Sequence, residues 1–288
     1  MRIVLVAGAT GYLGSHVVKE LQYQQLPFKA IARNAAKLRA MGLTSDQILR
    51  AEVTHADALK GLMDGVDVLI STVGITRQKD GLTYMDVDYQ ANSNLLEEAK
   101  RVGVKKIIYV SAIGGEQMRH LKIFAAKEKF VDELKASGID YTIVRPNGFF
   151  SDMNDFLQMA KGGKVYLFGH GNHKLNPIHG ADLAKAIIEA IAEPAKELVI
   201  GGPDILTQKE IAELALRAWK RPVKIIHLPD WVRRGIIAVM QIVTPSRVYG
   251  PIEFFLSMLA QDNIAPRYGV HRLSSYFKRE VDQLHENA

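Results

Sequence analysis

The chain has 288 residues, of which 48% are hydrophobic and 24% are charged, with no cysteine and a formal net charge of +6. This composition is typical of a globular protein with one large core and room for a smaller lobe. It excludes disulfides, thiolate catalysis and zinc–cysteine sites. Because the Lys and Arg residues are scattered, an anionic cofactor or substrate explains the positive charge better than a nucleic acid does.

The first element is a short apolar strand that runs into a glycine-rich turn. Residues 3–14 read IVLVAGATGYLG, with glycines at positions 8, 11 and 14. Such glycines let the backbone turn sharply, approach a pyrophosphate and start a helix whose free N–H groups attract anions. The apolar spacing of Val17, Val18 and Leu21 predicts that helix. The segment therefore predicts dinucleotide binding.

Strands and helices then alternate along the chain. In order, we predict a strand at Phe28–Ala32, a helix at Ala35–Met41, a strand at Ile48–Val53, a helix at Leu59–Met63, a strand at Val66–Ser71, a helix at Tyr89–Arg101, a strand at Lys106–Ser111, a helix at Leu121–Ala136 and a strand at Tyr141–Arg145. This alternation indicates a doubly wound, Rossmann-like α/β domain with a parallel sheet, which we expect over residues 1–150.

The pattern is looser beyond residue 150, and residues 151–288 are expected to form a small C-terminal substrate lobe. Residues 178–202 are expected to return to the main sheet, with Asp182 capping a helix and Leu198–Ile200 forming a strand. Thr207 and Glu210 form a capping box before a helix at Ile211–Trp219. The apolar run Ile236–Val243 is too short to span a bilayer and predicts a core helix rather than a membrane anchor.

No segment of the sequence has the length and hydrophobicity of a transmembrane helix, and the first residues lack the pattern of a signal peptide. We therefore expect a cytoplasmic protein.

The end of the second strand indicates which dinucleotide is bound. An NAD site usually carries an acidic residue there to hold the ribose 2′-hydroxyl. Here Arg33 occupies that place, and Lys37 follows one helical turn later. Arg33 can bind a 2′-phosphate through two N–H groups, and we expect no Asp or Glu near it. NADP(H) is accordingly preferred over NAD(H).

Several loops are expected to border one crevice, because they follow the carboxyl ends of parallel strands. They are the Gly8–Gly14 loop, Arg33, Thr72–Gly74, Ser111 and Pro146–Phe149.

Five motifs carry a resemblance to a known family: GATGYLG at 8–14, DVLISTVG at 67–74, GVKKIIYVSAIGG at 103–115, ASGIDYTIVRPNGFF at 136–150 and PIHGADLAKAI at 177–187. The chain resembles the atypical, NmrA-like branch of the short-chain dehydrogenase/reductase superfamily. That branch includes divinyl reductases, isoflavone-reductase-like enzymes, photosystem assembly factors and an accessory subunit of respiratory complex I. The resemblance implies a Rossmann sheet of six or seven strands.

The resemblance also implies a set of cofactor-binding residues. Adenine would lie near Glu52 and Val53, and Thr72, Val73 and Gly74 would follow the cofactor toward the nicotinamide. Pro146, Asn147 and Phe149 would flank the nicotinamide ring, and Lys127 would hold its ribose. The remaining candidates are Gly8, Thr10, Gly11, Tyr12, Leu13, Gly14, Arg33 and Lys37.

The active site of this superfamily usually contains a Ser and a helical YxxxK motif. Four residues place Tyr and Lys on one helix face, where the Lys lowers the pKa of the phenol. Ser111 fits the Ser and Lys127 fits the Lys, so these are the two candidate catalytic residues. Ile123, however, stands where the Tyr is expected, and no Tyr in the chain has a Lys four residues later.

Three functions remain open. One is an NADP(H)-dependent reductase of a small carbonyl or unsaturated substrate, whose proton comes from water, Lys127, His120, Tyr109 or Tyr84. Another is a non-catalytic NADP(H)-binding sensor or assembly protein with a protein partner. The third is chemistry like that of a nucleotide-sugar epimerase, which normally needs the Tyr. No metal site is predicted, because the spacing of His170, His173 and His179 matches no zinc pattern.

Overall fold

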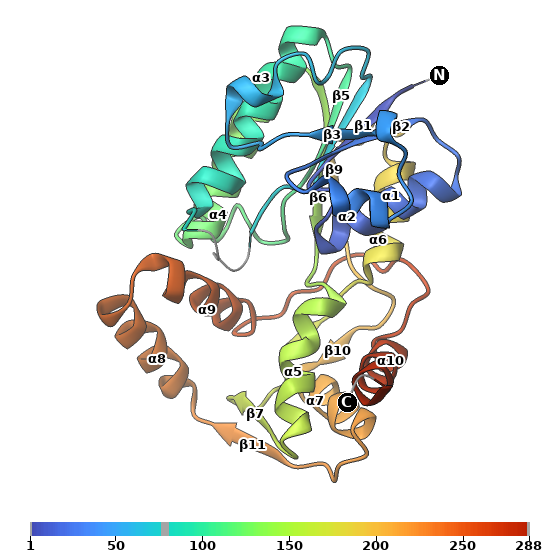
Figure 1. Cartoon of the computed structure of the whole chain (residues 1–288). Helices are drawn as coiled ribbons and strands as arrows, with labels where there is room; N and C mark the ends of the chain where they lie inside the picture. The colour runs from blue at the N-terminus through green and yellow to red at the C-terminus, as the bar shows by residue number, and fades with distance from the viewer. Residues whose placement is uncertain (1, 76–80, 287–288) are drawn as a thin grey trace. The chain divides into compact units, whose positions relative to one another are not determined.

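A computed structural model describes residues 2–75 and 81–286 of the chain (Figure 1). It has two compact units. The first consists of Met1–Arg145 and Leu183–Leu198, and the second of Pro146–Asp182 and Val199–Ala288. The first unit contains most of a seven-stranded parallel sheet with helices on both faces. The predicted Rossmann-like α/β fold is confirmed.

The sheet has the strand order β3-β2-β1-β4-β5-β6-β9. Its strands are β1 (Val4–Ala7), β2 (Phe28–Ala32), β3 (Ile48–Arg50), β4 (Val68–Ser71), β5 (Lys106–Val110), β6 (Asp140–Pro146) and β9 (Glu197–Ile200). The order reverses at β1, which lies between β2 and β4. Loops after these strands therefore meet at the switch point where ligands bind in open α/β sheets.

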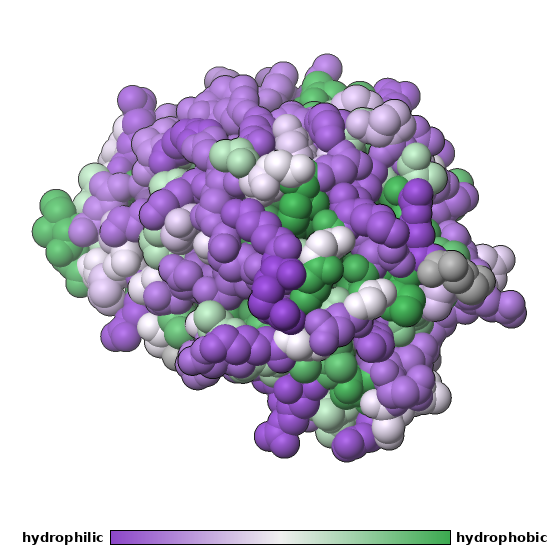
Figure 2. Space-filling model, turned by 90° about the horizontal axis from the view of Figure 1, so that it is seen from above, coloured by the Kyte–Doolittle hydropathy of each residue, from purple (hydrophilic) through white to green (hydrophobic). Residues whose placement is uncertain are grey.

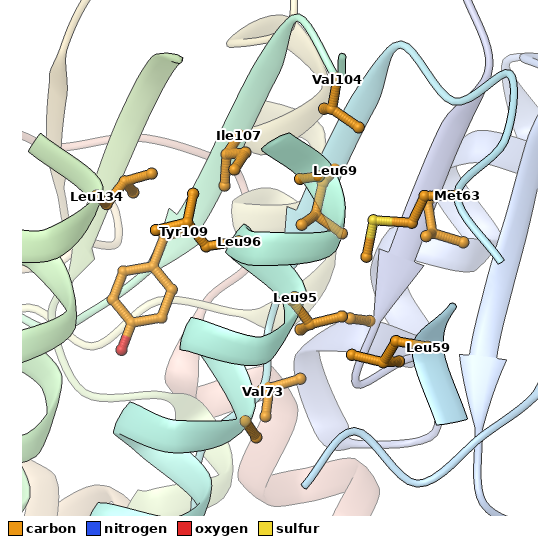
Figure 3. Close-up of a cluster of buried hydrophobic side chains, with 14 of the residues drawn as sticks. Leu59, Met63, Leu69, Val73, Leu95, Leu96, Val104, Ile107, Tyr109 and Leu134 are labelled. Atoms are coloured by element: carbon orange, nitrogen blue, oxygen red, sulfur yellow. The ribbon is translucent and has the colours of Figure 1, made fainter. Parts of the chain in front are cut away.

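The helices of the first unit are α1 (Tyr12–Tyr23), α2 (Ala35–Ala40), α3 (Asn92–Val102), α4 (Lys122–Ala136) and α6 (Gly180–Glu189), whose first residues belong to the second unit. Figure 1 shows α3 and α4 on one face of the sheet, with α1 and α6 on the other. Between the sheet and α3 and α4 lies a core of buried side chains (Figure 3), among them Leu69, Leu95, Ile107 and Tyr109.

Two predicted helices of this unit differ from the structure. Leu59–Met63 does not form an α-helix, because a 3-10 helix at Ala56–Leu59 is followed by a turn. Another 3-10 helix, Ser45–Gln47, precedes β3. The helix predicted at Tyr89–Arg101 begins earlier, because a π-helix at Met85–Ala91 leads directly into α3. π-Helices are rare and occur often at functional sites.

The second unit is built around its own apolar core. Its elements are a 3-10 helix (Phe150–Met153), α5 (Asn154–Lys161), β7 (Val165–Phe168), β8 (Lys174–Leu175), β10 (Leu206–Thr207), α7 (Gln208–Ala218), β11 (Ile225–Leu228), α8 (Asp230–Val243), α9 (Ser246–Met258) and α10 (Leu273–Glu286). The capping box of Thr207 and Glu210 is confirmed at the start of α7.

Two predictions for this half are wrong. Asp182 does not cap α6, because that helix begins two residues earlier, at Gly180. The apolar run Ile236–Val243 is helical, as predicted, but no residue of α8 is buried, so it is not a core helix. Among the residues that the structure describes, no helix is long and apolar enough to cross a membrane.

Candidate functional site

The glycine loop between β1 and α1 packs as the sequence motif requires. Gly8 has a φ of +80°, which only glycine adopts without strain, and a Cβ there would lie 2.6 Å from Thr72 Oγ1. A Cβ on Gly14 would lie 2.1 Å from the carbonyl oxygen of Gly8. The loop is thus folded tightly onto the start of α1, and it lies against the residue that follows β4.

The start of α1 is open to an anion. Gly11 is its N-cap and has no side chain to bond the first N–H groups of the helix. Such groups, together with the helix dipole, attract phosphates. Of the other loop candidates, Thr10 is partly buried, Leu13 is buried and the ring of Tyr12 packs edge-on against His16 at 5.2 Å.

A cavity of about 410 Å³ lies beside the carboxyl ends of β2 and β3. Arg33 lines it, as do two arginines that the sequence did not point to, Arg39 in α2 and Arg50 at the end of β3. Lys37, which was predicted to contribute, is not among the lining residues. The parallel pairing of Ala32 with Arg50 explains the juxtaposition, because it brings the ends of β2 and β3 together.

An acidic side chain does lie near Arg33, contrary to the prediction. Arg33 Nε is 3.6 Å from Glu52 Oε2. Glu52 follows β3, so it approaches Arg33 from the adjacent strand although the two residues are far apart in the sequence. The next residue, Val53, is held by its backbone, since Asn94 Nδ2 donates to its carbonyl oxygen at 3.1 Å.

Lys127 is buried in a specific charge pair. Its Nζ lies 2.8 Å from Oδ1 of Asp88, a carboxylate from the π-helix that is fully buried. A Cβ on Gly74 would lie 2.7 Å from Asp88 Oδ1 and 2.9 Å from Lys127 Nζ. The pair therefore lies directly against the loop after β4, and the absence of a side chain on Gly74 makes room for it.

The electrostatics of this pair favour a protonated lysine. Burial opposes the charge of Lys127, but the adjacent Asp88 carboxylate outweighs it, so the pKa of Lys127 is raised above its usual value. Burial also raises the pKa of Asp88, and the Lys127 ammonium opposes that shift. Among the described residues, Asp88 Oδ1 has no well-formed hydrogen bond and is held by its ion pair with Lys127. Asp88 Oδ2 accepts from the N–H of Ile75 at 3.2 Å.

Ser111 belongs to a second buried network. Its hydroxyl donates to Glu128 Oε1 at 3.0 Å, and Arg145 binds both oxygens of the same carboxylate at 2.7 and 3.0 Å. A Cβ on Gly115 would lie 2.2 Å from Glu128 Oε1, so the glycine makes room for this carboxylate. Glu128 was not predicted from the sequence, since a glutamate beside a helical lysine is typical of a solvent-exposed face.

The position at which the superfamily carries its tyrosine is apolar here and is buried away from solvent. Ile123 is buried on α4, one turn before Lys127. Tyr109 is also a core residue: its ring packs edge-on against Phe130 at 4.6 Å, and Figure 3 shows its hydroxyl pointing away from Leu96. Burial raises the pKa of Tyr109. Tyr84 is buried as well, whereas His120, in the loop before α4, is exposed.

The candidate residues Pro146, Asn147 and Phe149 lie at the end of β6 and just after it, where the second unit begins. The side-chain amide of Asn147 is engaged inside that unit: it donates to Asn176 Oδ1 at 2.8 Å and to the carbonyl of Asn263, and it accepts from the N–H of Gly148. Pro146 is buried, and the N–H of Phe149 donates to Asp152 at 2.9 Å. The amide of Asn147 thus has a structural role.

Asp182 and two histidines form a further polar group in the second unit. Asp182 accepts hydrogen bonds from the N–H groups of Val270 and His271, and its Oδ1 lies 2.8 Å from His271 Nδ1. The ring of His271 stacks on that of His179 at 4.2 Å. This explains Asp182 without a capping role. Within residues 2–75 and 81–286, no three His, Asp or Glu side chains converge as metal ligands.

Relatives of known activity resemble the chain over most of its length. It is 31% identical to the divinyl chlorophyllide a 8-vinyl-reductase of Arabidopsis thaliana, over 98% of this chain and 75% of that protein. It is 26% identical to an NAD(P)H azoreductase of Xenophilus azovorans, over 78% of this chain and 77% of that one. Both relatives are reductases by name.

The fold has close counterparts among solved structures. An NADPH-dependent quinone oxidoreductase of Escherichia coli, solved with NADPH, superposes with a TM-score of 0.71 at 20% identity, over 98% of this chain and 99% of that one. The model of the NAD(P)H-binding family matches residues 8–194, which include the glycine loop, Arg33 and Lys127. The chain therefore belongs to the NAD(P)H-binding, Rossmann-fold family, in the NmrA-like branch that its motifs resemble.

Proposed function

We propose that this protein is an NADP(H)-dependent reductase that transfers hydride to a small carbonyl-containing or unsaturated substrate without the usual tyrosine. The observation that carries the proposal is the buried Asp88–Lys127 pair against Gly74. A lysine with only a solubilising role would be exposed to solvent. Lys127 is instead buried against the loop after β4, and its burial costs desolvation free energy. The reductase relatives support the same reaction class.

The residues present fit an NADP(H) molecule. The open start of α1 suits the pyrophosphate, and the three arginines of the 410 Å³ cavity suit a 2′-phosphate. At the reacting end, the N–H groups of the Lys127 ammonium are the donors suited to the ribose hydroxyls, and Asp88 holds that ammonium in place. Bound NADPH would supply the hydride; the side chains of this chain hold and orient it.

The proton of the reduction needs a separate source. Lys127 is a poor donor near neutral pH, because Asp88 holds its ammonium protonated. Tyr109 is poorly suited as well, since it is enclosed in the core and its pKa is raised. Ser111 already donates its proton to Glu128. We therefore assign proton delivery to water or to the exposed His120.

The test is NADPH oxidation, followed at 340 nm, against substrates of the kinds that the similar proteins reduce. The panel contains divinyl chlorophyllide, an azo dye and a quinone, with aldehydes and enones added. We expect substrate-dependent oxidation with at least one of them. If NADPH fails to bind in isothermal titration, the whole proposal is wrong.

The roles of Lys127 and Ser111 are tested by unequal effects on turnover. The variant Lys127→Met with Asp88→Asn removes both charges together, so neither is left buried alone, and we expect kcat to fall by about 100-fold. Ser111→Ala should lower kcat less than about tenfold, because the hydroxyl is engaged with Glu128. Equal losses in both variants would contradict these roles.

A second candidate is an NADP(H)-binding sensor or assembly protein without turnover. The observation that favours it is the apolar closure around Ile123 together with the engaged hydroxyl of Ser111. Tight NADPH binding with no oxidation across the panel, and a protein partner recovered from the native cells, would favour this candidate.

A further inference from the structure

The helix α8 exposes the side that a globular protein normally buries. Trp231, Val239, Ile242 and Val243 are 69%, 57%, 85% and 66% exposed. None of the 14 residues of the helix is buried. An exposed apolar group of this kind marks an interaction surface.

The exposed apolar side chains share one face of α8. At about 100° per residue, Trp231, Ile236, Val239, Ile242 and Val243 fall within an arc of about 140°. Of the half-buried residues, Arg233, Ile237 and Met240 lie on the opposite side and Val232 lies within the arc, and Arg233 Nε binds Asp230 at 2.7 Å. The amphipathic helix is therefore turned with its apolar face outward.

The helix α9 continues this surface. It follows α8 after Thr244 and Pro245 and packs against it as a hairpin. Val248 and Ile252, four residues apart on one side of α9, are 43% and 36% exposed. Hydrophobic residues gather at the left edge of the view in Figure 2, the side on which α8 and α9 lie in Figure 1. We call the exposed apolar residues of α8 and α9 the hairpin face.

Cations border the hairpin face. Arg234, with a side chain that is 71% exposed and an Nε 3.2 Å from Asp230 Oδ2, lies next to Trp231 around the helix, and Arg247 is exposed in the first turn of α9. Between residues 220 and 258 the chain carries six Lys or Arg and two Asp or Glu. The long arginine side chains can reach past an apolar layer to anionic groups.

We propose that the hairpin face binds the surface of an anionic lipid bilayer. The hairpin face has the composition of an amphipathic helix that lies in the plane of a membrane. Such a helix buries Trp, Ile and Val below the lipid headgroups and places its Arg side chains among the headgroups. With 14 and 13 residues, α8 and α9 are shorter than the roughly 20 residues that cross a hydrocarbon core, so the hairpin would lie along the surface. A second copy of the chain would bring like-charged arginine borders together, whereas anionic headgroups complement both.

The experiment is vesicle flotation of the full chain with and without NADPH. We expect binding to phosphatidylglycerol–phosphatidylcholine vesicles, weaker binding to pure phosphatidylcholine, and weaker binding in 0.5 M salt than in 0.1 M. The double variant Val239→Asp with Ile242→Asp should lower the partition coefficient of the protein into anionic vesicles by about 30-fold or more. It removes two apolar anchors and adds two negative charges. Arg234→Glu with Arg247→Glu should abolish the preference for anionic lipid.

The matched control is Tyr23→Asp, which places an acid at an exposed apolar residue of α1, 84% exposed, and should leave binding unchanged. All substituted side chains are exposed, so thermal unfolding should be the same in every variant. Absence of binding to anionic vesicles would overturn the proposal, as would binding unaffected by the double aspartate variant. A dimer in light scattering that this variant converts to a monomer, without vesicle binding, would assign the face to a second copy instead. Because lipid binding requires no turnover, the result does not depend on the proposed reductase activity.

Discussion

Replacing Asp88 by asparagine is expected to lower the free energy of unfolding by about 3–5 kcal/mol. The substitution removes the only described side-chain carboxylate in ion-pair contact with Lys127 Nζ, and it leaves an ammonium enclosed against Gly74. Taking a cation out of water costs far more than the hydrogen bonds of an amide return. Lys127 would have to lose its proton or open the loop after β4 to water.

Urea unfolding of the full chain measures this effect. The control is Asp132→Asn, the same chemical change in the exposed pair of Asp132 with Arg119, where we expect a loss below about 1 kcal/mol. Adding Lys127→Met to Asp88→Asn should restore most of the lost stability, because no buried charge then remains. A loss in Asp88→Asn no larger than in Asp132→Asn would show that the buried pair is not a strong interaction.

The local features of the dinucleotide-binding unit were predictable from the sequence. Gly8 acts through its own positive φ and Gly14 through its close approach to Gly8, so the motif itself carries this geometry. The strand at Phe28–Ala32 is found at those residues, because four of its five residues are apolar and suit a parallel strand that is buried on both faces.

Features that depend on neighbouring strands or on a helix register were not predictable. Arg50 and Glu52 meet the region of Arg33 only through the pairing of β2 with β3. Asp88 faces Lys127 because a π-helix turns it inward, and an ordinary helical pattern does not reveal that register. The same limit applies to α8, whose apolar residues predicted a buried face that the structure leaves exposed.

Arg33→Ala is expected to weaken NADPH binding by about 100-fold and to leave NADH binding within about threefold. A charge-assisted, two-point contact to phosphate contributes about 2–3 kcal/mol. In this chain the loss is also electrostatic, because Glu52, 3.6 Å from Arg33 Nε, would then repel a phosphate without the adjacent cation of Arg33. Arg50→Ala, which removes a second cation from the same cavity, should weaken NADPH binding by about tenfold.

Isothermal titration with both cofactors at 0.1 M and 0.5 M salt checks these values. Arg119→Ala serves as the control, since Arg119 is exposed, pairs with Asp132 and does not line the cavity. NADPH should lose more affinity in high salt than NADH does, because the extra phosphate adds the charge that salt screens. Glu52→Gln should strengthen NADPH binding, since it removes the one acidic side chain within salt-bridge distance of Arg33 among the described residues. Equal losses for NADPH and NADH in Arg33→Ala would mean that Arg33 does not contact the 2′-phosphate, and the preference for NADP(H) would lose its structural basis.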